Sequence, residues 1–172
     1  MKVGSLLVAD TQRSEALRIP ANARGRRRLA AILAHSGDSW FWLLGLALTW
    51  LLGDSPTRTW AIAVAAAIGV LAIVVLGLKK LVRRPRPEGD WGQIYRATDP
   101  HSFPSGHAAR AFLLAVLATG WGPVWLAPIL WIWAPLVCLA RVALGVHFLS
   151  DVAVGAVIGI VVGLAMIVLA PI

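Results

Sequence analysis

The sequence predicts an all-α integral membrane protein, a helical bundle of about five transmembrane helices with an N-terminal amphipathic helix. Of its 172 residues, 59% are hydrophobic and 14% charged, whereas a soluble domain is about half apolar and about a quarter charged. The apolar residues form five long runs, and the net charge of +8 is confined to short segments beside them. This composition excludes a disordered chain and an ordinary soluble enzyme, and the single cysteine excludes a disulfide scaffold.

Residues 1–35 form a basic segment in which arginines are interleaved with leucine and isoleucine. We expect an amphipathic helix lying on an anionic membrane surface; a simple cluster of charges that sets the topology is the alternative. No apolar core follows Lys2 closely enough for a cleaved signal peptide. The chain is therefore expected to divide into this segment and a transmembrane bundle over residues 36–172.

Five apolar runs predict the membrane-spanning helices, because a span needs about 20 mostly apolar residues. The first run is short, and Pro128 and Pro135 in the fourth are expected to kink that helix without ending it. The runs are 38–53, 60–78, 106–121, 124–144 and 149–170. Five spans leave almost no soluble part, so the functional residues must lie in the bundle or in its short loops.

Because successive spans alternate in direction, the 79–105 connection and the junction of the last two spans share one side of the membrane. That side receives three of the four histidines and nearly all the lysines and arginines, whereas Arg58 lies on the opposite side. Such a basic cluster fits an anionic ligand at a membrane. It does not fit a nucleic-acid partner, for which the charge would spread over a polar face.

His147 and Asp151 lie four residues apart where the last span begins, so they share one face of a helix. A carboxylate in this position can hold an imidazole in one tautomer and stabilise its cationic form, as a nucleophile and its orienting partner require. A hydrogen bond that only caps the helix is the alternative. An ionisable pair beside a membrane segment is nevertheless a functional candidate.

The tetrapeptide Pro104-Ser105-Gly106-His107 begins the third span. Proline and serine favour a helix start, and Gly106 lets a ligand approach the first-turn N–H groups, which bind phosphate oxygens. His107 is placed to pass a proton to a leaving oxygen. An ordinary N-cap with an incidental histidine is the alternative.

A run of cations and prolines, residues 79–87, follows the second span. Such a run is most often a topology signal or a contact with lipid headgroups, but here the prolines stop the helix and fix the backbone of Arg86. The planar fork of an arginine suits bidentate phosphate recognition, and Lys79 adds a compact point charge. Arg141 offers a further clamp from another helix.

Together the three motifs resemble the signature of the type 2 phosphatidic acid phosphatases, whose superfamily includes the vanadium haloperoxidases. The match covers residues from about 60 to 155, and Ala140 stands where the family usually has serine. The matched residues, in the family's order and spacing, are Lys79, Arg86-Pro87, Pro104-Ser105-Gly106-His107, Arg141, His147 and Asp151.

The resemblance implies a phosphohydrolase without metal or other cofactor that works through a phosphohistidine. It makes His147 the nucleophile and Asp151 its orienting partner, while His107 protonates the leaving group and then activates water. The phosphoryl oxygens would be held by Lys79, Arg86, Arg141, Ser105 and the Gly106 backbone N–H. Arg83 and Arg84 fall outside the matched positions, so we expect them to matter much less.

The leading interpretation is a lipid phosphatase acting on a lipid phosphomonoester or diphosphate. The resemblance admits phosphatidic acid, phosphatidylglycerol phosphate, polyprenyl phosphates or diphosphates, and phosphorylated lipid A. One alternative is a phosphotransferase of the same family that passes the phosphoryl group to an alcohol. A second is a non-enzymatic transporter with a basic vestibule, which would not need the spacing of the two histidines and the aspartate.

The expected location is a bacterial inner membrane, crossed several times. The basic cluster 24–28 lies on the same side as the predicted site when the spans number five. Because lysine and arginine are enriched on the cytoplasmic side, the cytoplasmic face is favoured for the site. The outer face is the alternative, which would follow if residues 17–35 crossed the membrane.

Overall fold

The computed structural model describes residues 3–89, 99–170 and 172, and within them it consists of seven helices without a β-strand. The predicted all-α class is therefore confirmed. The helices are α1 (Val3–Ala16), α2 (Arg24–His35), α3 (Ser39–Leu52), α4 (Ser55–Val82), α6 (Gly106–Trp121), α7 (Leu126–Ala143) and α8 (Leu149–Leu169).

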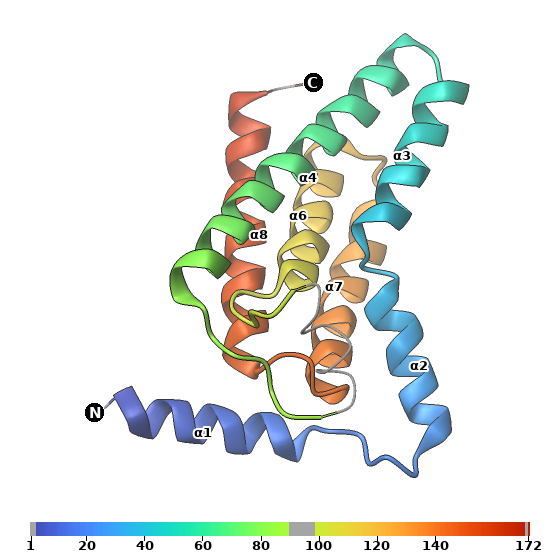
Figure 1. The fold of residues 1–172 in the computed structure, drawn as a ribbon. Coiled ribbons are helices and arrows are strands. Elements are labelled where there is room, and N and C mark those ends of the chain that lie inside the picture. The colour runs from blue at the N-terminus through green and yellow to red at the C-terminus, as the bar shows by residue number, and fades with distance from the viewer. Residues whose placement is uncertain (1–2, 90–98, 171) are drawn as a thin grey trace.

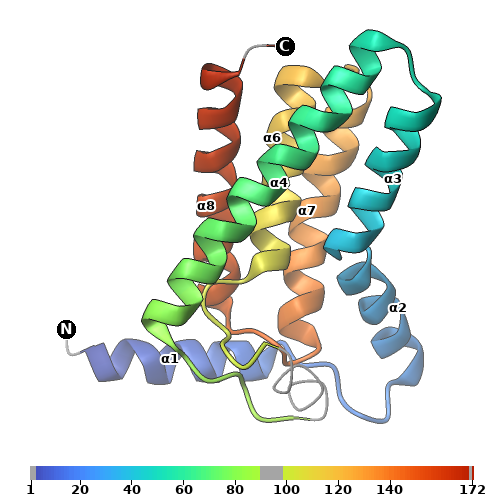
Figure 2. The ribbon, with the colours of Figure 1, turned by 45° about the horizontal axis from the view of Figure 1, so that its top comes forward.

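The long helices run roughly alongside one another, and α1 lies across one end of the bundle (Figure 1). Figure 2 shows the same arrangement after rotation, with the C-terminal end of α8 far from α1. The end of α4 and the starts of α6 and α8 all lie toward the end of the bundle that α1 crosses. The polar motifs predicted from the sequence are thus gathered at a single end of the bundle.

Three of the described helices, α4, α7 and α8, are long and apolar enough to cross a membrane. With 14 and 16 residues, α3 and α6 are shorter than the roughly 20 residues that a span needs. The count of five spans therefore stays a prediction. Pro135 lies inside α7 without ending it.

In the described part of residues 1–35, two helices, α1 and α2, are separated by a connection that contains Pro20, a residue that cannot continue a helix. The second of them, α2, buries Ala30 and Ala34 against Ala140 and Leu144 at the C-terminal end of α7. A break over residues 36–38 separates α2 from α3. This break lies beside the start of α6 and becomes part of the candidate site.

Three glycines of α8 bring its backbone into direct contact with α6. A Cβ atom added to Gly159 would lie 2.0 Å from the Ala109 carbonyl oxygen, and one on Gly155 would lie 2.5 Å from that of Ser105. A Cβ on Gly163 would approach the side chain of Val116 at 2.8 Å. Small residues allow this close approach of membrane helices, and it places the first turns of α6 and α8 side by side.

Candidate active site

The structure brings the predicted residues together from four helices and two connections. Lys79 comes from the last turn of α4, Arg141 from the last turn of α7, and His107 from the first turn of α6. Of the eight predicted residues, Gly106 and His107 are partly buried. The other six have exposed fractions of 5% or less: Lys79, Arg86, Ser105, Arg141, His147 and Asp151. A buried cluster of cations and imidazoles at the end of an apolar bundle can neutralise an anionic group.

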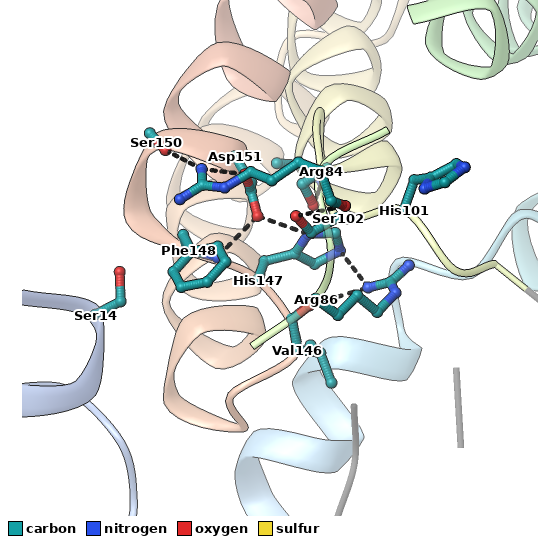
Figure 3. A network of polar contacts seen from close by, with 12 residues as sticks. Ser14, Arg84, Arg86, His101, Ser102, Val146, His147, Phe148, Ser150 and Asp151 are labelled. Atoms are coloured by element: carbon teal, nitrogen blue, oxygen red, sulfur yellow. Dashed lines mark hydrogen bonds and ion pairs between the residues drawn. The ribbon is translucent and has the colours of Figure 1, made fainter. Parts of the chain in front are cut away.

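The imidazole of His147 lies between a carboxylate and a guanidinium. Its Nδ1 is 3.5 Å from Oδ2 of Asp151 and its Nε2 is 3.3 Å from Nη1 of Arg86 (Figure 3). Because a guanidinium only donates hydrogen bonds, Nε2 carries the lone pair and Nδ1 carries the proton that faces Asp151. Burial, and then the positive charges of Arg141 and Arg86, lower the pKa of His147 well below its ordinary value. The ring is therefore neutral near pH 7, as a nitrogen nucleophile must be.

Lys79 and Arg86 share a carboxylate that the sequence analysis does not single out. Oδ2 of Asp99 is 2.6 Å from Nζ of Lys79 and 2.7 Å from Nη2 of Arg86. Nε of Arg86 also donates to the Asp99 carbonyl oxygen at 2.7 Å. An anionic oxygen thus bridges the two cations that are expected to bind a phosphoryl oxygen. In sequence, Asp99 looks no different from Glu88, the other described acidic residue of this connection.

Replacing Asp99 by asparagine is expected to tighten the binding of vanadate or inorganic phosphate by about tenfold, because one competing charge-assisted contact is lost. Titration of inhibition by vanadate would measure this change. Glu88→Gln is the matched control: it removes the same charge from an exposed side chain of the same connection and should leave vanadate binding unchanged. Unaltered or weaker binding in Asp99→Asn would contradict the expected competition.

His107 has a carboxylate partner of its own, Asp38, from the break between α2 and α3. Its Nε2 is 2.6 Å from Oδ1 of Asp38, whose Oδ2 lies 3.1 Å from Nδ1 of His35. Burial would raise the pKa of Asp38, but hydrogen bonds from His107 and His35 outweigh it and hold the pKa well below its ordinary range. The ionised carboxylate can stabilise a protonated His107.

The break that carries Asp38 is held by other polar contacts. Nε1 of Trp42 donates to the Ser36 carbonyl oxygen at 2.9 Å, and Nε1 of Trp133 donates to the Ser36 hydroxyl at 2.8 Å. Arg110 donates to the Gly37 carbonyl. Asp38 is missing from the predicted site because an aspartate before an apolar run has the appearance of an ordinary N-cap, and no spacing rule links it to His107.

Ser105 and Gly106 occupy the positions expected at a helix start. The Ser105 hydroxyl accepts from the Ala108 N–H at 3.4 Å, and the Ser105 N–H donates to the Asp151 carbonyl at 3.0 Å. A Cβ atom on Gly106 would meet only Val75, at an ordinary 3.6 Å. Protein packing alone therefore does not require glycine here, and the open backbone is available to a ligand.

Arg84 contacts Asp151 although it lies outside the matched motif. Its Nη1 is 2.8 Å from Oδ1 of Asp151. The small importance expected for Arg84 must therefore be revised, because it is ion-paired with a predicted site residue. Arg83 is exposed and donates from Nε to the Lys80 carbonyl at 2.8 Å, so the same expectation is kept for Arg83.

Comparison with known proteins places this site in a family. The family model described as the PAP2 superfamily matches residues 58–171. The decaprenylphosphoryl-5-phosphoribose phosphatase of Mycobacterium tuberculosis is 37% identical over 148 residues, which cover 83% of this chain and 76% of the relative.

Two solved structures have similar folds. The PAP2-type phosphatidylglycerolphosphate phosphatase from Bacillus subtilis has a TM-score of 0.76 and 24% identity, covering 94% of this chain and 84% of the other. Aquifex aeolicus LpxE has a TM-score of 0.69 and 28% identity, covering 89% of this chain and 93% of the other. With the family match, the helical membrane fold and the gathered motifs, the chain belongs to the PAP2 superfamily and is an integral membrane phosphatase.

Proposed function

We propose that the protein hydrolyses a lipid phosphomonoester or diphosphate, without a metal ion, through a phosphohistidine on His147. The observation that carries the proposal is the orientation of this imidazole: its Nε2 lone pair faces Arg86, and Lys79 shares the Asp99 carboxylate with Arg86. Phosphoryl transfer depends mainly on positioning and on neutralising charge at the equatorial oxygens. Lys79, Arg86 and Arg141 supply that charge here.

In the first step the phosphate group displaces Asp99 from the cations, and Nε2 of His147 attacks phosphorus. The bond between phosphorus and the leaving oxygen breaks, and protonated His107 gives its proton to that oxygen. Asp38 holds Nε2 of His107, so Nδ1 is the nitrogen left for the substrate. Asp151 stabilises the positive charge that develops on the His147 ring.

In the second step His107, now neutral, takes a proton from water as the water oxygen attacks the phosphohistidine. The bond between nitrogen and phosphorus breaks, inorganic phosphate forms and His147 returns to its neutral state. His107 is protonated again at the end of the cycle. His107 therefore acts first as an acid and then as a base. It can do both because the water enters on the side of phosphorus from which the alcohol left.

The substrate is expected to place a headgroup at the end of the bundle while its chains stay beside the apolar helices. A cavity of about 760 Å³ lies between α1 and the 82–88 segment, and Arg86, Arg84 and Phe148 contribute to its lining. This volume suits a headgroup larger than phosphate. The similarity to a phosphatase of a polyprenyl-linked phosphoribose supports a polyprenyl-linked phosphomonoester as the first compound to test.

The cytoplasmic face of a bacterial inner membrane is the proposed location of the site. The arginine-rich start of α2 lies toward the same end of the bundle as α1 (Figure 1). Lysine and arginine near membrane segments favour the cytoplasmic side, and α1 adds the exposed apolar side chains of Leu6, Leu7 and Val8 for contact with the lipid surface.

Phosphate release by the purified protein from a panel of lipid phosphates tests the proposed function. We expect turnover to persist in EDTA, because the cations of the site are side chains, and we expect vanadate to inhibit by adopting the pentacoordinate geometry on His147. Complete loss in EDTA with recovery in Mg²⁺ would contradict the metal-independent mechanism. Phosphorylation of an added alcohol in place of phosphate release would identify a phosphotransferase, and the absence of both would favour a transporter.

A further inference from the structure

The N-terminal helix α1 caps the first turn of α8. The Ser14 hydroxyl accepts from the Leu149 N–H at 2.9 Å, and Oδ1 of Asp10 accepts from the Ser150 N–H at 3.1 Å. The residue before α8 is Phe148, whose side chain has no oxygen to offer these groups. A helix N-terminus needs acceptors for its first N–H groups, and here a different helix supplies them.

Asp10 also binds Arg84. Its Oδ2 is 2.8 Å from Nη2 of Arg84, while Nη1 of the same guanidinium reaches the Ser150 hydroxyl at 2.7 Å and Oδ1 of Asp151 at 2.8 Å. The guanidinium carbon lies 3.9 Å from the centre of the Phe148 ring. Arg84 is therefore fixed between two carboxylates, one on α1 and one on α8.

The orientation of Asp151 depends on contacts at both of its oxygens. Oδ1 binds Arg84, whereas Oδ2 accepts from the Phe148 N–H at 2.9 Å and faces His147 (Figure 3). The side chain is fully buried, and a buried carboxylate stays ionised only with such partners. Rotation of the carboxylate would carry Oδ2 away from the imidazole, so the bond at Oδ1 helps to fix the contact at Oδ2.

The charges along this line alternate. Asp10 is negative, Arg84 positive and Asp151 negative, and His147 becomes positive when it is phosphorylated under the proposed mechanism. Without Asp10, the positive charge of Arg84 would be balanced by Asp151 alone. Asp151 would then stabilise the cationic imidazole of His147 less. Burial would raise the pKa of Asp10, but hydrogen bonds from Ser150 and Arg84 lower it overall, so this carboxylate is ionised.

We propose that Asp10 is a positioning residue that acts through Arg84 to orient and balance Asp151, which makes the N-terminal helix a working part of the active site. The proposal rests on the proposed roles of Asp151 and His147. It predicts an effect on the rate of phosphoryl transfer rather than on substrate binding, because no atom of Asp10 touches the cations that are proposed to bind the phosphate.

Asp10→Asn is the sharpest test, since asparagine keeps an oxygen for the Ser150 N–H but loses the charge that faces Arg84. We expect kcat to fall by about tenfold, the lower end of the loss seen when an outer-shell partner of a metal-bound histidine is removed, with KM unchanged. Rapid-quench labelling with an aryl phosphate should show slower phosphohistidine formation. Ser14→Ala is the matched control: it removes a cap of α8 without touching Arg84, and should keep kcat within about twofold of wild type.

A double-mutant cycle separates positioning from a general loss of structure. Arg84→Gln should lower kcat, and adding Asp10→Asn to it should cost little more in kcat, because Asp10 acts through Arg84. If Asp10→Asn does not fold, Asp10→Ser, which also loses the charge that faces Arg84, takes its place in the cycle. Independent losses in the double variant, a loss in KM alone, or an equal loss in Ser14→Ala would overturn the proposal.

The same assays keep this proposal distinct from the proposed function. Turnover that survives in His147→Ala would refute the phosphohistidine mechanism whatever the result for Asp10. Full dependence on His147 combined with a wild-type kcat in Asp10→Asn would refute only the positioning role.

Discussion

Replacing His147 by alanine is expected to abolish both turnover and covalent labelling by an aryl phosphate, whereas His107→Ala should accumulate label. The first variant lacks the nitrogen that is proposed to attack phosphorus. The second lacks the residue proposed as proton donor and base, but an aryl oxide leaves with little protonation. The phosphohistidine therefore still forms and is hydrolysed slowly. A rapid-quench experiment with labelled aryl phosphate would follow the acid-labile label in each variant.

Two carboxylate variants serve as comparisons in the same experiment. Asp151→Asn should slow the formation of label, because the asparagine supports the cationic His147 poorly. Asp38→Asn should resemble a mild form of His107→Ala, since it removes the charge 2.6 Å from the His107 ring. Label found in His147→Ala would contradict the role of His147 as nucleophile. Absence of label in His107→Ala, when wild type is labelled, would contradict the role of His107 as acid and base.

Lysine in place of Arg86 or Arg141 is expected to lower kcat/KM by about a hundredfold, the scale at which a preorganised donor stabilises a transition state. Arg86 uses all of its nitrogens: Nε and Nη2 bind Asp99, and Nη1 binds the Val146 carbonyl at 2.9 Å and faces His147. An ammonium group keeps the charge but cannot reproduce this planar set of donors. Steady-state kinetics on the released phosphate would measure the loss.

Arg83→Lys is the control for this prediction. Arg83 is exposed and lies three residues from Arg86 in the same basic run, so a substitution there changes the local potential without touching the site. Activity close to that of wild type is expected. Equal losses of activity at Arg83, Arg86 and Arg141 would contradict specific phosphate contacts by Arg86 and Arg141. They would show that these cations act only through their summed charge.

The parts of the site that could be predicted from the sequence are those set by local spacing. His147 and Asp151 face each other because four residues make about one turn of a helix. Ser105 lies at the start of α6 because serine accepts from the first N–H groups. The helical class followed from the apolar runs, since the backbone in lipid must satisfy its own hydrogen bonds.

The remaining partners could not be predicted because tertiary packing brings them in. Asp38 and His107 are 69 residues apart, and Asp10 and Arg84 are 74 residues apart. Asp10 lies in the 1–35 segment, whose arginines and leucines predicted a contact with the membrane or a cluster of charges that sets the topology. Its contact with Arg84 depends on α1 lying across the end of the bundle, which no periodicity of the sequence encodes.

Gly155 and Gly159 bring the backbone of α8 against backbone atoms at the start of α6, and Gly163 meets the Val116 side chain. Since His107 begins one of these helices and Asp151 lies in the first turn of the other, the separation between the two halves of the chemistry is fixed by the scaffold. Packed backbones slide in discrete steps or not at all. We therefore expect the motions that admit and release substrate to arise in the helices around this pair, such as α3 and α4. Substrate range can then diverge in those outer helices while the reaction coordinate stays the same.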